Sequence, residues 1–150
     1  MSARVRSLLV ALILLASGAA ASEARAQTPD TSLYKRMGGY DVIAAVVDDF
    51  FARFDKDPDL TPFLGGLNAA AGGRIRQHFV DFFCARTGGP CLYNGRDMNA
   101  AHSGLRIRKP HFDAVLRHFD AALDTQQVGA REKREIMTML RALESEIVQG

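Results

Sequence analysis

The sequence predicts an all-α domain, and three observations lead to that prediction. Apolar residues recur in several segments at the three- and four-residue spacing of amphipathic helices. Glycine pairs and prolines separate these segments. No segment alternates apolar and polar residues over a useful length, as a half-buried strand would. The sequence contains neither an internal repeat nor the signs of a second domain.

The first 26 residues are expected to be a secretory signal peptide. Two arginines precede an apolar run over residues 8–15, which passes into a stretch of small residues. An A-x-A motif favours cleavage between residues 26 and 27, and cleavage between residues 21 and 22 is the alternative. The apolar run is short for a membrane span, which needs about 20 residues; an uncleaved anchor is the competing interpretation. We therefore expect an exported domain over residues 27–150, periplasmic or secreted, with no stable membrane span.

Charge and length limit the class of this domain. The leader holds three of the 19 Lys+Arg and one of the 17 Asp+Glu, so residues 27–150 hold 16 of each and have no formal net charge. A nucleic-acid partner would require a clustered basic face, and none is expected. The 124 residues that remain after cleavage suffice for one compact core.

The first half of the domain contains two predicted helices and two shorter turns. Residues 33–37 form at most a turn or so before Gly38-Gly39 ends it. Residues 41–54 are predicted to form an amphipathic helix. Residues 58–64 form a short apolar turn, and a second firm helix is predicted over residues 74–86.

The second half begins with a long irregular segment. Gly88-Gly89-Pro90 ends the preceding helix, and residues 91–108 are predicted to be loop-like. Within this segment, Asp97 is suited to cap a short turn. Pro110 is predicted to stand at the first position of the next helix. The last helix is predicted over residues 130–148.

Two cysteines, Cys84 and Cys91, follow the leader. An oxidising compartment favours a disulfide between them, which would stabilise the fold by roughly 2–3 kcal/mol. Two independent thiols are the alternative. The sequence lacks C-x-x-C-H, so covalent attachment of a c-type haem is not expected.

The four histidines do not reveal a function by their spacing. His78, His102, His111 and His118 do not form a closed zinc site, and no nucleophile elbow or phosphate-binding loop appears. His111 and His118 are expected to be exposed or capping. His78, at the edge of an apolar stripe, is placed either to turn toward a cavity or to reach solvent. By its local sequence alone, His102 is a surface residue in a turn.

The order of motifs resembles that of the group I truncated haemoglobins over roughly residues 32–148. The resemblance is strongest over residues 93–105 and includes the glycine pairs 38/39 and 88/89. It implies a two-over-two helical sandwich with a very short first helix and a loop-like proximal segment. It also implies non-covalently bound haem b, with His102 as the proximal iron ligand. The segments that carry it are 33–39, 43–51, 62–64, 78–83, 88–90, 93–105 and 111–115.

The same resemblance implies a set of haem contacts, and the distal ones depart from the family pattern. Phe51 stands where the family commonly has a hydrogen-bonding tyrosine, and Phe79 where it often has glutamine. His78 is the remaining polar group there, and it is suited to bind the iron as a distal ligand or to donate a hydrogen bond to the bound gas. The alternative is that His78 points to solvent or to a haem propionate. The implied contacts are Phe50, Phe51, Phe63, Leu64, Ile75, His78, Phe79, Tyr93, Met98, His102 and Phe112.

The resemblance implies a haem protein that binds oxygen, nitric oxide or carbon monoxide, for oxygen transport or gas scavenging. An external reductant would then be needed to keep the iron reduced. One alternative is a six-coordinate haem protein that transfers electrons or clears peroxide. Nitric oxide dioxygenase activity is another alternative, and a non-haem interaction module is a third.

Overall fold

The computed structural model describes residues 31–149, and all regular structure in this range is helical. This finding confirms the all-α prediction. The predicted signal peptide, residues 1–26, lies outside the described residues. None of the described helices is long and apolar enough to cross a membrane. The helices are α1 (Leu33–Met37), α2 (Tyr40–Phe54), α3 (Thr61–Leu64), α4 (Ala69–Arg86), α5 (Met98–His102), α6 (Lys109–Thr125), α7 (Ala130–Arg141) and α8 (Glu144–Ile147).

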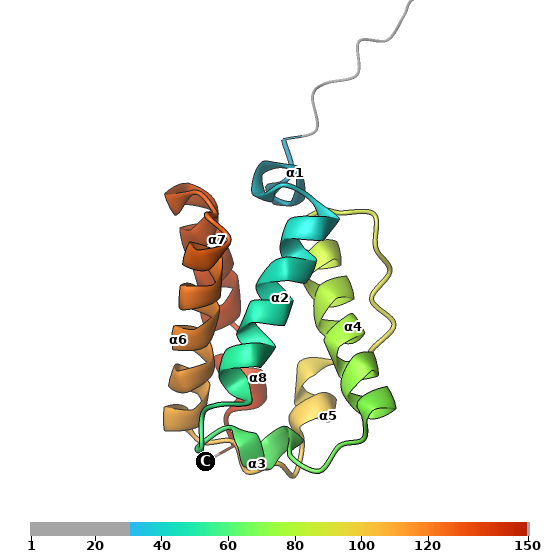
Figure 1. Cartoon of the computed structure of the whole chain (residues 1–150), viewed down its shortest axis with the longest axis vertical. Helices are drawn as coiled ribbons and strands as arrows, with labels where there is room; N and C mark the ends of the chain where they lie inside the picture. The colour runs from blue at the N-terminus through green and yellow to red at the C-terminus, as the bar shows by residue number, and fades with distance from the viewer. Residues whose placement is uncertain (1–30, 150) are drawn as a thin grey trace, which may run out of the picture.

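The long helices form two facing pairs. α2 packs against α4 on one side and against α6 on the other (Figure 1), and α6 also packs against α7. The α2–α4 pair and the α6–α7 pair thus form the expected two-over-two arrangement. α1 lies at one end of the bundle, and the short helices α3 and α5 lie at the opposite end (Figure 1).

Local sequence explains why the first helix is only five residues long. Gly38 follows it with φ 105° and Gly39 with φ 81°, in the left-handed region that favours glycine. An alanine Cβ at Gly38 would lie 2.6 Å from a methyl group of Val42, so a side chain is excluded there sterically as well. The chain can therefore turn sharply from α1 into α2.

Two predicted helices differ from the structure by more than one residue at a boundary. α4 begins at Ala69 instead of residue 74, because the Asn68 side chain accepts a hydrogen bond from the Ala71 amide at 2.9 Å and starts the helix earlier. The predicted last helix is divided into α7 and α8. Between them the Leu143 amide bonds to the carbonyl of Leu140, three residues back, at 3.0 Å, and this tighter turn buries Leu143 to 4% exposure.

The core is held by aromatic rings from three helices. Phe50 of α2 stacks on Phe119 of α6 with ring centroids 3.9 Å apart. Phe79 and Phe83 of α4 contact the same Phe119 ring at 6.3 and 5.0 Å. Phe50 and Phe119 are each only 1% exposed. These contacts set the spacing of α2, α4 and α6, and therefore the frame that carries the candidate site.

A disulfide joins Cys84 at the end of α4 to Cys91 in the following loop, with a Cα–Cα distance of 5.7 Å. Replacing both residues by alanine is expected to lower the free energy of unfolding by about 2.5 kcal/mol, since the bond closes a short loop in the unfolded chain. Urea unfolding of the oxidised protein and of the double variant measures this difference. Equal midpoints in the two proteins would contradict the expectation.

An ion pair between α2 and α4 gives a pH-dependent contribution to stability. The Arg76 guanidinium donates two hydrogen bonds to the Asp48 carboxylate, at 2.5 and 2.8 Å. These bonds hold the pKa of Asp48 below its ordinary value of 3.8. The stability that the pair adds is therefore complete above this value and is lost as pH falls through the lower folded-state pKa.

Asp48→Asn is expected to cost less than about 1 kcal/mol at neutral pH, because the carboxylate is largely exposed and screened by solvent. The difference from the unsubstituted protein should be constant from neutral pH down to about pH 5 and should shrink below about pH 4. Urea unfolding at a series of pH values tests this. A difference that grows on acidification would show that the sign is wrong.

Candidate functional site

His102 lies at the end of the short helix α5, in a turn that fixes its ring. Asp97 caps the helix by accepting a hydrogen bond from the Ala100 amide at 2.8 Å. One turn later, His102 Nδ1 lies 2.7 Å from the carbonyl oxygen of Met98. Since a carbonyl only accepts, Nδ1–H donates, and the neutral ring keeps its lone pair on Nε2. An imidazole oriented in this way through its other nitrogen is suited to bind a metal.

The end of the described chain also anchors α5. The Gln149 side-chain amide donates a hydrogen bond to the His102 carbonyl at 3.0 Å, and α5 packs against α8. The short helix is therefore fixed although loops flank it on both sides. Gln149 carries no sequence signal for this role, because 47 positions separate it from His102.

His78 of α4 is half-buried and carries a polar atom without a partner. Within residues 31–149, its Nδ1 is buried and has no hydrogen bond. The imidazole ring lies edge-to-face with Tyr93, with ring centroids 6.1 Å apart. A buried polar nitrogen without a partner is uncommon and disfavours the fold unless another group satisfies it.

The two phenylalanines predicted to be distal bring apolar rings together. Phe51 of α2 and Phe79 of α4 are both half-buried, with ring centroids 5.0 Å apart. Neither ring can donate a conventional hydrogen bond. Phe50, the neighbour of Phe51, points into the core instead, against Phe119. Ile75 lies one turn before Phe79 on α4 and is also half-buried.

The remaining predicted contacts are distributed over α3, α5, α6 and the loop before α5. Phe63 and Leu64 of α3 and Met98 of α5 are half-buried and pack against the core. Phe112 of α6 is 3% exposed. The half-buried Tyr93 donates a hydrogen bond from its hydroxyl to the Arg96 carbonyl at 2.6 Å, and burial raises the pKa of Tyr93, which keeps the phenol neutral.

The other two histidines have structural partners. His111 Nδ1 accepts a hydrogen bond from the Arg108 amide at 3.2 Å, at the start of α6. Capping is one of the two roles, exposed or capping, that the sequence predicted for it. His118 was predicted to be exposed or capping, and this prediction is wrong: its half-buried ring lies 2.7 Å from the Asp57 carboxylate, which draws it against the protein. This hydrogen bond holds the pKa of Asp57 below its usual value.

Taken together, these residues fit haem. A porphyrin needs apolar side chains against its faces and a neutral imidazole nitrogen for its iron. His102 supplies an Nε2 whose orientation is fixed, and His78 supplies a second, half-buried imidazole whose Nδ1 lacks a partner. The half-buried side chains of Phe51, Phe79 and Met98 offer apolar surface.

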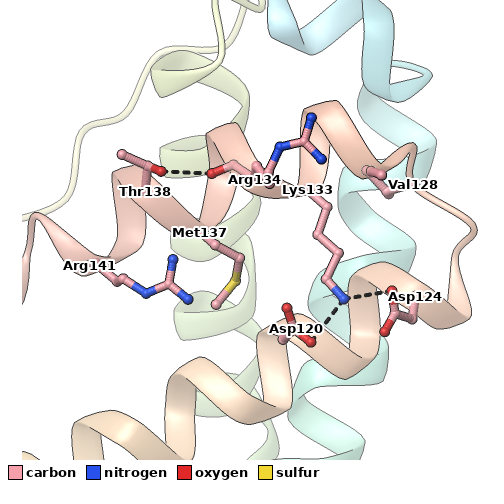
Figure 2. A pocket seen from close by; sticks show the side chains of 9 residues that line it. Asp120, Asp124, Val128, Lys133, Arg134, Met137, Thr138 and Arg141 are labelled. Atoms are coloured by element: carbon pink, nitrogen blue, oxygen red, sulfur yellow. Dashed lines mark hydrogen bonds and ion pairs between the residues drawn. The ribbon is translucent and has the colours of Figure 1, made fainter.

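A separate groove of about 520 Å³ lies between α6 and α7. Figure 2 shows the Lys133 ammonium between two carboxylates, those of Asp120 at 2.9 Å and Asp124 at 2.6 Å. The hydrogen bonds that Lys133 donates to Asp124 and Asp120 raise the pKa of Lys133 above its ordinary value. None of the predicted haem contacts lines this groove. Its ion pairs connect α6 to α7 and thus contribute to the helical frame.

Comparison with known proteins finds relatives over nearly the whole described chain. A family model described as bacterial-like globin matches residues 32–149. Group 1 truncated haemoglobin GlbN of Mycolicibacterium paratuberculosis is 34% identical over 119 residues, which cover 79% of this chain and 85% of the relative. GlbN of Nostoc sp. (strain MUN 8820) is 31% identical over 118 residues, which cover 79% of this chain and 98% of the relative.

A crystal structure of truncated haemoglobin from Tetrahymena pyriformis, in its Fe(III) form, superposes with a TM-score of 0.73. It is 23% identical and covers 79% of this chain and 99% of that chain. This likeness confirms the two-over-two helical fold.

The helical sandwich, together with the matching family model and these relatives, defines a haem-binding globin. The chain belongs to the bacterial-like globin family and, within it, to the group 1 truncated haemoglobins.

Proposed function

We propose that this globin reversibly binds a diatomic gas (oxygen, nitric oxide or carbon monoxide) at haem held by His102, in a periplasmic or secreted location. One observation carries the proposal: the bond from His102 Nδ1 to Met98 oxygen leaves Nε2 free to bind iron. We further propose that the cofactor is haem b and is held non-covalently, since Cys84 and Cys91 are bonded to each other and the described residues hold no free thiol.

Residues on the two sides of the haem have different roles. Haem iron, when bound, supplies the coordination position that takes up the gas. The Met98 carbonyl orients the His102 ring on the proximal side of the haem. The apolar side chains of Phe51 and Phe79 exclude water from the distal side. These two rings offer no hydrogen bond to oxygen. A charge-assisted hydrogen bond is worth about 1.5–3 kcal/mol, so its loss speeds oxygen release by about one to two orders of magnitude.

This property makes nitric oxide dioxygenation a weaker proposal than gas binding, because that reaction requires oxygen to persist in the site. The unpartnered nitrogen of His78 favours a different second candidate. With His78 and His102 both bound to the iron, the globin would serve electron transfer or peroxide removal. Both candidate functions require an external reductant.

Absorption spectra of the haem-loaded protein separate these functions. If His78 binds the iron, the ferrous spectrum is six-coordinate and carbon monoxide displaces His78. His78→Leu should convert it to a five-coordinate high-spin spectrum, since leucine cannot bind iron. His118→Gln, whose position lies outside the predicted haem contacts, is the control and should leave the spectrum unchanged. A five-coordinate spectrum before any substitution would rule out distal ligation and leave gas binding at an open site.

A further inference from the structure

Tyr93 packs against the same turn of α4 that carries His78. Its ring lies edge-to-face with the His78 imidazole at 6.1 Å and with Phe82 at 5.4 Å. His78 and Phe82 are four residues apart on the helix, so their side chains are neighbours on one face. Tyr93 therefore covers both of them from the loop that precedes α5.

Three features of that loop hold Tyr93 in place. Its hydroxyl donates to the Arg96 carbonyl at 2.6 Å. Its ring lies directly against Gly95, where an added Cβ would be 2.6 Å from Cε2 of the tyrosine. The disulfide of Cys91 ties the loop to Cys84, which is fully buried in α4. The position of the ring is thus set by the loop, independently of His78.

The conformation of His78 requires such a support. Its Nδ1 is buried without a hydrogen bond, whereas a half-buried histidine at the edge of a helix face can usually rotate to reach water. Within residues 31–149, the ring contact of His78 is the edge-to-face one with Tyr93, and an aromatic pair of this geometry favours the orientation that it holds.

We infer that Tyr93 is a positioning residue that holds the His78 imidazole turned inward, toward the distal side of the haem, and that the Cys84–Cys91 disulfide anchors it there. This inference rests on the proposed distal role of His78. It assigns to Tyr93 an effect on gas binding that acts through His78, since its own hydroxyl is already bonded to Arg96.

Two substitutions remove the contact in different ways. Tyr93→Leu deletes the aromatic ring, and Gly95→Ala displaces it while leaving the tyrosine in the chain. The backbone of Gly95 is outside the left-handed region, so alanine there disturbs mainly the Tyr93 ring. Tyr93→Phe keeps the ring and loses only the Arg96 bond. Leu92→Ala is the matched control, because Leu92 is in the same loop and is 87% exposed.

The measurements are the six-coordinate fraction of the ferrous protein and the rate constant for carbon monoxide binding. An edge-to-face pair corresponds to about a 2- to 12-fold change in an equilibrium constant. Tyr93→Leu and Gly95→Ala should therefore lower the ratio of six- to five-coordinate protein by about this factor and speed carbon monoxide binding accordingly. Replacing both cysteines should change the coordination ratio and the rate constant in the same direction. Tyr93→Phe should change both quantities less, and Leu92→Ala should leave both unchanged.

A second measurement separates this inference from the distal-ligand proposal. In the diamagnetic carbon monoxide complex of the full chain, the imidazole NMR signals of His78 report its packing whether or not it binds iron. Tyr93→Leu and Gly95→Ala should shift these signals toward those of a solvent-exposed histidine. If His78→Leu leaves the optical spectrum unchanged but the NMR shifts occur, distal ligation fails and the positioning role stands.

Unshifted His78 signals in both variants would overturn the inference. A rise in the six-coordinate fraction would also overturn it, because Tyr93 would then be holding His78 away from the iron. If Tyr93→Leu does not fold, Gly95→Ala alone decides the outcome.

Discussion

Replacing His102 by alanine is expected to abolish tight haem binding. The imidazole Nε2 is the nitrogen that the Met98 hydrogen bond leaves available, and alanine offers no replacement ligand. Removing a residue that only hydrogen-bonds to a metal ligand typically weakens metal binding by about 10- to 100-fold. Loss of the ligand itself should therefore raise the dissociation constant by more than about 100-fold. Titration of the haem-free chain with haem, followed by the Soret absorbance, measures this change.

Two controls separate the loss of a ligand from the loss of the fold. His118→Gln removes an imidazole from α6 and should bind haem normally. Free imidazole added to His102→Ala should restore a histidine-like spectrum, because α5 and the apolar walls remain in place. Unchanged haem affinity in His102→Ala would show that another residue is the proximal ligand.

The surroundings of His102 could be predicted only in part. A capped turn at Asp97 was readable from the sequence, and the structure forms α5 there. The residue types alone predict a surface histidine at position 102, and only the resemblance to the family predicts that it is the proximal iron ligand. The Gln149 bond could not be predicted, because it joins parts of the chain that are brought together only by the packing of α5 on α8.

The phenylalanines of α2 show a second limit. The apolar pattern of this helix includes both Phe50 and Phe51. Neighbouring residues on a helix point about 100° apart, so the two side chains cannot both point toward the same place. Phe50 enters the core and Phe51 stays half-buried, where it contacts Phe79. Similarly, the small residues at the start of α4 concealed its true beginning, because they carry no apolar pattern and include Gly72 and Gly73. Periodicity therefore located the helices better than it assigned each side chain to the core or the site.

Phe119→Ala is expected to cause the largest loss of stability among the substitutions considered. The ring is 1% exposed and contacts Phe50, Phe79 and Phe83. Removing it leaves a cavity at the meeting point of three helices, and such a change costs about 3–5 kcal/mol. Since small proteins are stable by only about 5–15 kcal/mol, this loss is a large part of the total.

Urea unfolding of the haem-free chain measures this loss without the contribution of bound haem. Leu92→Ala, at an exposed apolar position, is the control and should change stability by less than about 0.5 kcal/mol. Phe119→Leu should fall between the two, because it leaves a smaller cavity. Phe79 packs against Phe119, so the loss of this ring should also loosen the packing of Phe79. Haem binding by the Phe119→Ala variant should therefore weaken although His102 is intact. A loss below about 1 kcal/mol would mean that the neighbouring rings collapse into the space, and that the aromatic stack does not set the spacing of α2, α4 and α6.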